Sequence, residues 1–68
     1  MNAPKLKAKI AELNIKQATL CKIWKKSRQT VSSKVNGKIP ITLDEAQRFS
    51  EYANLTDEEK INIFLSDE

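Results

Sequence analysis

The fold is decided by residues 27–38, which read SRQTVSSKVNGK. Val31 and Val35 are spaced i, i+4 and therefore form an apolar stripe on one face of a helix. Ser27 is suited to cap the start of this helix, and Gly37 is suited to end it in the left-handed conformation. The pattern predicts a short helix of about nine or ten residues.

The face opposite the two valines is small and polar. It carries Gln29, Ser32, Ser33 and Asn36, where an ordinary solvated helix more often has Glu and Lys. Side chains of this kind both donate and accept hydrogen bonds. We therefore expect this helix to lie against nucleic acid; the alternative is a plain surface helix.

Length and composition limit the other possibilities. Sixty-eight residues form one small domain, residues 1–68, with a modest core. The single cysteine and the absence of histidine exclude an internal disulfide, a zinc site and the usual general base. No apolar run approaches the ~20 residues of a membrane span, and no signal peptide is present. We expect a complete small cytoplasmic protein, not an enzyme, with no cofactor, metal, membrane or small-molecule partner.

The net charge of +3 hides a strong asymmetry along the chain. Residues 1–38 contain ten basic residues and one acidic residue, a balance of +9, whereas residues 39–68 contain two basic and eight acidic residues, a balance of −6. This division indicates a basic half that meets a polyanion and an acidic half that faces away from it.

Two further helices are predicted before the central stretch. Leu6, Ile10 and Leu13 recur with helical spacing, which predicts a helix from Pro4 to Leu13 that ends at Asn14. A second helix is expected from Gln17 to Trp24. It would bury Leu20, Cys21 and Trp24, with Cys21 and Trp24 as core residues; the alternatives are a reactive thiol and a base-stacking ring.

The connector Lys25-Lys26 is so short that the helices on either side must cross steeply, as in a helix-turn-helix. Such a turn commonly needs a positive φ, which would cost Lys25 about 1 kcal/mol.

Two capping boxes predict the remaining helices. Thr42 and Glu45 would start a helix that buries Leu43, Ala46, Phe49 and Ala53 and ends at Asn54. Thr56 and Glu59 would start a last helix that buries Ile61, Phe64 and Leu65. Ile63 would then face outward, either as a lone exposed residue or, with Phe64 and Tyr52, as a self-association patch.

The segment from Leu6 to Lys38 resembles the lambda-repressor-like, phage Cro and repressor type of helix-turn-helix protein. The matching positions are Leu13, Gln17, Leu20, Cys21, Trp24, Ser27, Arg28, Thr30, Val31, Ser32, Asn36, Gly37 and Lys38. The resemblance covers nearly the whole chain, since the two last helices complete that family's plan. It implies an all-α, compact five-helix domain with the helix-turn-helix at the second and third helices.

Two positions depart from that family. Its turn commonly contains glycine, where this chain has Lys25, and many members pair an arginine with a glutamate where this chain has Ile10 and Val35. Packed apolar residues can replace a buried ion pair with little loss of stability.

The resemblance implies that the third helix enters the DNA major groove with its first residues at the base edges. The side-chain chemistry agrees, because Arg28 can bind guanine O6 and N7, and Gln29 can pair with adenine N6 and N7. Ser33 lies one turn beyond Gln29 and is the third candidate for base contact.

Phosphate contacts are expected from helix N-termini and nearby donors. The resemblance places Gln17 against the DNA backbone, and Lys16 precedes it. We expect further contacts from the amides of Asn36 and Gly37 and from Lys38, and from three residues of the third helix and its cap, Ser27, Ser32 and Lys34.

One such helix reads only a few base pairs, so a homodimer on a pseudo-palindromic double-stranded operator is expected, with half-sites about 34 Å apart or a multiple of this. The bound dimer would regulate transcription by excluding polymerase or a competing repressor. The acidic half would face away from DNA and could carry the dimer contact.

The main rival is a helical protein-interaction module, antitoxin-like or an antirepressor, because one fold can serve either function. RNA binding is less favoured because the chain lacks a platform of aromatic residues for base stacking. An enzyme is disfavoured because the clustered carboxylates lie where helix caps need them.

Overall fold

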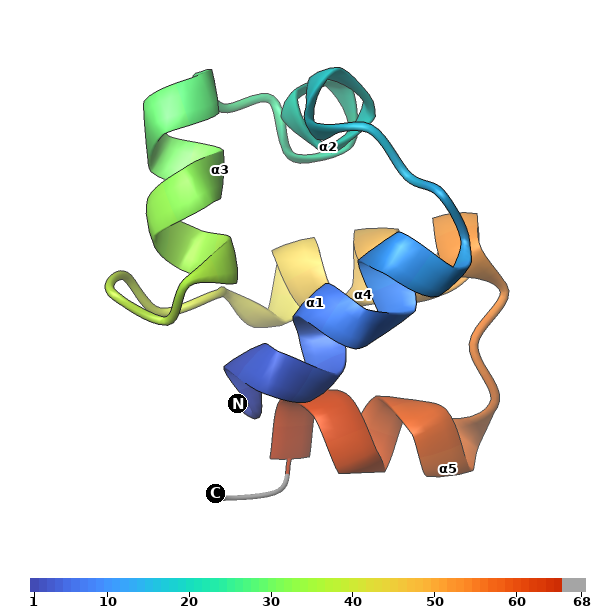
Figure 1. Cartoon of the computed structure of the whole chain (residues 1–68). Coiled ribbons are helices and arrows are strands. Elements are labelled where there is room, and N and C mark those ends of the chain that lie inside the picture. The colour runs from blue at the N-terminus through green and yellow to red at the C-terminus, as the bar shows by residue number, and fades with distance from the viewer. Residues whose placement is uncertain (66–68) are drawn as a thin grey trace.

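Helices form all the regular structure of residues 1–65, the part of the chain that this computed structural model describes. Asp67 and Glu68, which contribute to the acidic half, lie outside the described residues. The elements, shown in Figure 1, are α1 (Ala3–Glu12), α2 (Gln17–Trp24), α3 (Arg28–Val35), α4 (Leu43–Ala53) and α5 (Asp57–Lys60), which continues as a π-helical segment, η1 (Ile61–Leu65). The prediction of a compact all-helical domain is confirmed for these residues, with a radius of gyration of 10.7 Å.

The helix ends are those expected from the sequence. Ser27 caps α3, while Thr42 and Thr56 each form a complete capping box at the start of α4 and α5. The left-handed conformation occurs at Asn14, Lys25, Asn54 and Gly37, after α1, α2, α4 and α3 respectively. Local side-chain chemistry therefore sets where the helices begin and end.

Phe49 of α4 lies at the centre of the core and is fully buried. Its ring contacts those of Trp24 and Phe64, at centroid distances of 6.4 and 6.0 Å. Trp24 also donates its indole N–H to the carbonyl of Glu45, at 2.9 Å. Trp24 is thus a core residue, as expected, and Cys21 packs half-buried beside the same cluster.

The inward faces of α4 and of the last helix differ from the prediction. Ile63 is buried, whereas Ile61 and Leu65 are exposed. In η1 the hydrogen bonds run i→i+5, so the α-helical spacing that assigned the inward face does not hold there. A self-association patch that includes Ile63 is therefore wrong. Leu43 is 85% exposed because it is the first residue of α4 and projects beyond the packed part of that helix.

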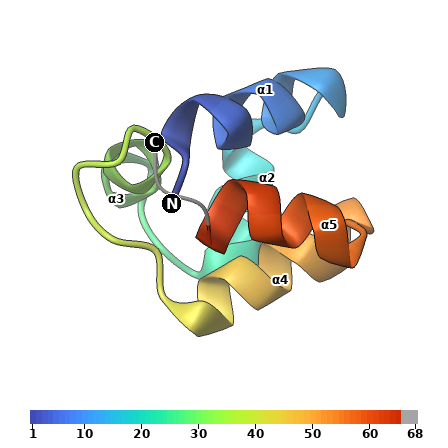
Figure 2. The same cartoon turned by 90° about the horizontal axis from the view of Figure 1, so that it is seen from below.

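The basic and acidic parts of the chain meet in one place, where the Lys9–Glu59 ion pair joins α1 to α5, while α2 and α3 lie away from α5. In Figure 1, α2 and α3 meet at a steep angle on one side of the molecule, and α5 lies on the opposite side. Figure 2 shows the loop after α3, the start of α4 and the end of α5 on a common side. The fold therefore presents α3 and the first turn of α2 together, away from α5.

Candidate nucleic-acid interface

The polar face of α3 is turned to solvent. Val31 is buried and Val35 is half-buried against the core, whereas Arg28, Gln29, Ser32 and Asn36 are exposed. Ser33 is only half-buried, and its carbonyl accepts hydrogen bonds from the amides of the following loop. Of the three residues expected at the bases, Arg28 and Gln29 are the fully accessible ones.

A short turn joins the end of α2 to the start of α3, and one side chain links the first turns of the two helices. Lys25 adopts φ 55°, ψ 46°, and Ser27 accepts a hydrogen bond from the Thr30 amide at 3.3 Å. The Gln17 side chain donates its Nε2–H to the carbonyl of Arg28 at 2.9 Å. This bond fixes the start of α2 beside the start of α3, so Gln17 has a positioning role that the sequence did not predict.

The start of α2 is open. Its N-cap residue, Lys16, is exposed and provides no side-chain cap. The Thr19 amide donates to the Lys16 carbonyl, but the first turn has no side-chain cap from Lys16, and the positive end of the helix dipole favours an anion there. Lys16 and the first turn of α2 together remain suited to a phosphate group.

Lys34 is not available for a phosphate contact, contrary to the prediction. Its ammonium lies 2.7 Å from Glu45 Oε1 and 3.1 Å from the Pro40 carbonyl, and the residue is 6% exposed. The sequence contained a signal for this, since positions 31, 34 and 35 share one helix face. Lys34 therefore ties α3 to α4 inside the protein.

The carboxylate of Glu45 remains ionised in this buried pair. Burial acts to raise the pKa of Glu45, but the hydrogen bonds from Lys34 and from the Thr42 amide outweigh it and hold the pKa below its ordinary value. Glu45 Oε1 serves both the ion pair and the capping box of α4.

The amides of Asn36, Gly37 and Lys38 are also used internally, which corrects the predicted phosphate contacts from the amides of Asn36 and Gly37. Their N–H groups donate to the carbonyls of Ser32, Lys34 and Ser33 respectively. Gly37 is needed for its φ of +79° and has no remaining donor. What this segment can offer a phosphate is the Lys38 ammonium and the Asn36 side chain, whose Nδ2–H now donates to Ser32.

The basic half carries a large uncompensated charge. Among residues 1–65, only Lys9 and Lys34 of its ten basic residues form ion pairs. The other eight have no acidic partner among these residues, and they lie on α1, along α2 and its two ends, at the start of α3 and just after α3. An anionic partner would supply the missing countercharge.

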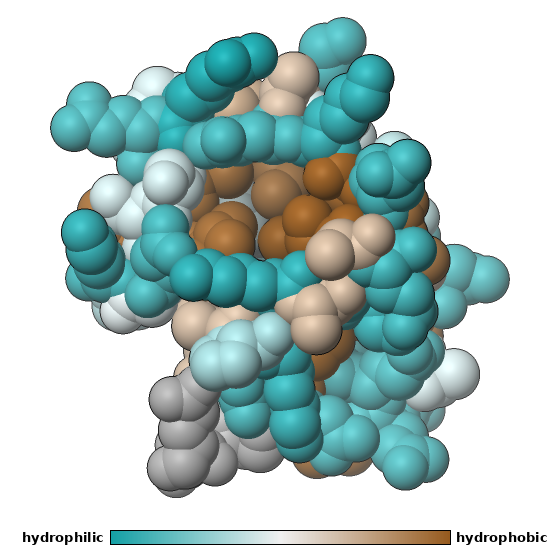
Figure 3. Space-filling view, in the orientation of Figure 1, coloured by the Kyte–Doolittle hydropathy of each residue, from teal (hydrophilic) through white to brown (hydrophobic). Residues whose placement is uncertain are grey.

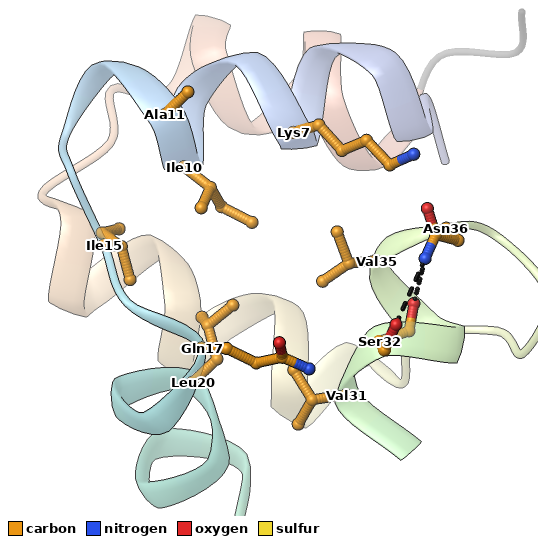
Figure 4. Close-up of a pocket in the computed structure, with 10 residues that line it drawn as sticks. All are labelled: Lys7, Ile10, Ala11, Ile15, Gln17, Leu20, Val31, Ser32, Val35 and Asn36. Atoms are coloured by element: carbon orange, nitrogen blue, oxygen red, sulfur yellow. Dashed lines mark hydrogen bonds between the residues drawn. The ribbon is translucent and has the colours of Figure 1, made fainter. Parts of the chain in front are cut away.

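A hollow of about 370 Å³ separates α1 from α3, with α2 at one end. Figure 3 shows its brown, apolar floor inside a hydrophilic rim. Figure 4 shows Ile10 and Val35 on opposite walls and Gln17, Ser32 and Asn36 at the rim. The sequence did not predict this cavity, because its walls come from three separate helices.

No family model, curated protein or solved structure matches this chain. The resemblance to lambda-repressor-like proteins thus remains a prediction from the residues that carry it. Over residues 1–65, no helix combines the length and apolar character needed to cross a bilayer. No cluster of three or more potential metal ligands occurs in the same residues.

Proposed function

We propose that this protein is a sequence-specific DNA-binding transcriptional regulator of the lambda-repressor-like, Cro type. In this proposal α2, the turn at Lys25 and α3 act as a helix-turn-helix, and α3 enters the major groove of an operator. The observation that carries the proposal is the exposed polar face of α3, which lies beside the open start of α2 within a surface of unpaired cations.

Arg28 and Gln29 would read the bases. Both are exposed in the first turn of α3, and their side chains match the donor and acceptor patterns of guanine and adenine. The Gln17–Arg28 hydrogen bond would set the angle at which this turn meets DNA. Ser33 would contribute at most from the flank of the groove because it is half-buried.

Phosphates would be bound at two places on either side of that turn. One is formed by Lys16 and the open start of α2, and the other by Ser32, Asn36 and Lys38 at the far end of α3. The ammonium groups would add a sequence-independent, salt-dependent part of the affinity, with a slope of roughly one unit per neutralised phosphate.

Binding to a pseudo-palindromic operator requires two copies, and the protein offers a surface for this. Ile39, Leu43 and Leu65 are exposed and line one hollow that lies just beyond the end of α3. Exposed leucines gathered in this way are typical of an interaction surface. The patch lies beyond the C-terminal end of α3, whereas Arg28 and Gln29 lie at its start, so we assign the dimer contact to this patch.

Selection of bound sites from a random pool of DNA duplexes tests the proposal. We expect a two-fold symmetric consensus whose half-sites are about 34 Å apart or a multiple of this distance. Replacing Arg28 and Gln29 by Ala should weaken binding to the selected site by at least about tenfold, because each bidentate base contact contributes about 1–3 kcal/mol.

The chain provides a matched control in Gln47 and Arg48, an exposed pair of the same residue types on α4. Their replacement by Ala should leave operator binding within about twofold, since they lie outside the basic half. The proposal is wrong if no sequence is enriched, or if the α3 double variant binds the selected site as tightly as the α4 double variant does.

The alternative is a protein-interaction module, antitoxin-like or an antirepressor, that uses the same fold. The exposed Leu43 and Leu65 are compatible with it. The two functions differ in their response to the Arg28 and Gln29 replacements. These should weaken DNA binding but not an interaction made through the exposed patch of Ile39, Leu43 and Leu65, the leucine patch.

A further inference from the structure

We infer that the hollow between α1, α2 and α3 is a binding site for a small amphiphilic carboxylate. Its volume of about 370 Å³ lies within the usual range for small-molecule pockets. Six apolar residues from the three helices and the connector between α1 and α2 line it: Ile10, Ala11, Ile15, Leu20, Val31 and Val35. Removing such a surface from water is favourable, so an apolar ligand body should bind there.

The two helices that form the walls of the hollow are each tied to a further element of the fold. On one side, α1 is tied to the last helix by the Lys9–Glu59 ion pair, at 2.6 Å, and by the hydrogen bond from the Asn2 amide to the Ile63 carbonyl, at 2.7 Å. On the other side, α3 is tied to α4 by the buried Lys34–Glu45 pair. Because α1 and α3 have separate anchors, the hollow is a preformed feature of the fold.

The rim selects the charge of the ligand. Among residues 1–65, Lys7 is the only charged residue that lines the hollow, and no acidic residue does. Within residues 1–65 its ammonium has no ion-pair partner, and Figure 4 shows it at the same end of the hollow as Asn36. Gln17 and Ser32 add neutral polar groups along the rim. A carboxylate beside Lys7, with its apolar body on the floor, complements this arrangement.

The position of the site connects it to DNA binding, a consequence that depends on the proposed function. Three rim residues, Gln17, Ser32 and Asn36, belong to or border the surface assigned to phosphates. A bound carboxylate would place negative charge beside those phosphates and would compete for the same donors. The ligand should therefore act as an inducer that weakens operator binding.

The test is a titration of the ¹⁵N-labelled protein with sodium octanoate, followed by amide chemical shifts in the absence of DNA. We expect saturable shifts centred on Ala11, Val31 and Val35, with a dissociation constant on the order of 1 mM or below for a ligand of this size. Octylamine, which has the same chain and the opposite charge, should bind at least about tenfold more weakly, because it meets Lys7 as a like charge.

Two pairs of exposed positions on α1 supply variants and controls. Lys7→Glu should weaken octanoate binding at least about tenfold, while Lys5→Glu, the same charge change outside the hollow, should alter it less than about twofold. Ala11→Trp should block binding by filling the hollow, whereas Ala8→Trp should not. Amide spectra of the variants check that each is folded.

The inference is overturned if octanoate produces no saturable shifts at these amides, if octylamine binds equally well, or if Lys5→Glu and Lys7→Glu behave alike. None of these readouts involves DNA, so a failure here leaves the proposed DNA binding unaffected. Conversely, if the protein binds octanoate but selects no DNA site, the carboxylate site is supported and the proposed DNA-binding function is wrong.

Discussion

At the scale of single residues, the left-handed positions show how much a local conformation can cost. Asn14 and Asn54 adopt φ near +55°, which asparagine tolerates, and Gly37 adopts φ 79° without strain. Lys25 has the same conformation with none of these advantages. It is retained in the turn that orients α3, so this strain lies next to the candidate interface.

Replacing Lys25 by Gly should stabilise the protein. Relief of the left-handed strain is worth about 1 kcal/mol, part of which is offset by the greater freedom of glycine in the unfolded chain. For a domain of this size we expect the melting temperature to rise by about 4 °C, measured by circular dichroism. Asn14→Gly is the control and should change it by less. An unchanged or lower melting temperature for Lys25→Gly would contradict this account.

At the scale of elements, α3 is held against α4 by an ion pair that is almost completely buried. Lys34 and Glu45 are 6% and 4% exposed, and Glu45 Oε2 has no hydrogen-bond partner in the structure. A buried pair of this kind adds little net stability relative to apolar residues, but removal of one partner leaves a buried charge. The Lys34–Glu45 pair therefore contributes more to the position of α3 against α4 than to the net free energy of unfolding.

Lys34→Met should destabilise the protein by about 3–5 kcal/mol, a large part of the stability of a small domain. The double variant Lys34→Met, Glu45→Gln should recover much of that loss, because Gln can still accept the Thr42 amide hydrogen bond of the capping box. Urea unfolding of the two single variants and the double variant measures the coupling. Strictly additive effects would show that the two residues do not depend on one another.

The same pair should make folding pH-dependent. Because the folded pKa of Glu45 lies below its ordinary value of 4.5, its contribution is complete above that value and is lost as the pH falls through the folded pKa. We expect the melting temperature to fall between about pH 5 and pH 2 and to fall less steeply in Glu45→Gln. The exposed carboxyl of Glu51 provides the control: Glu51→Gln should keep the slope of the wild type.

At the scale of the whole molecule, the two surfaces proposed here have different chemistry. The DNA-facing surface is made of cations and amide side chains from residues 16–38. The leucine patch lies over the loop after α3, the start of α4 and the end of η1, and Lys38 borders both surfaces. Figure 2 shows that these three segments share a side of the molecule although they are distant in the sequence. Dimer formation and DNA reading should therefore be separable by mutation.

Leu43→Asp should abolish dimer formation without unfolding the protein, because Leu43 is 85% exposed. Sedimentation equilibrium should then show a monomer, and operator affinity should fall by about a hundredfold or more, since the second half-site no longer contributes through the same complex. Tyr52→Asp, at another exposed site on α4, should leave both properties unchanged. If the Leu43→Asp variant still dimerises, the dimer contact does not lie at the leucine patch.

Much of the fold could be predicted from the sequence because it is locally encoded. The caps at Ser27, Thr42 and Thr56 and the left-handed residues at Asn14 and Asn54 act over a few residues, and the structure places each where expected. The exposure of Arg28 and Gln29 followed in the same way from the i, i+4 spacing of Val31 and Val35. Short-range rules are sufficient for these features.

The errors occurred where one helix meets another. Burial of Ile63 depends on the π-helical end of the chain and its bond to Asn2, and burial of Lys34 depends on Glu45, eleven residues away. The hollow beside Lys7 lies between α1 and α3, which are anchored to different partners. The sequence by itself thus determined where the helices begin and end and which face of α3 is polar, since those are local energies. Only the tertiary structure decided that Lys34 is neutralised in the interior and that an apolar hollow lies between α1 and α3. Both features depend on contacts between residues far apart in the sequence, and spacing rules within one helix do not predict such contacts.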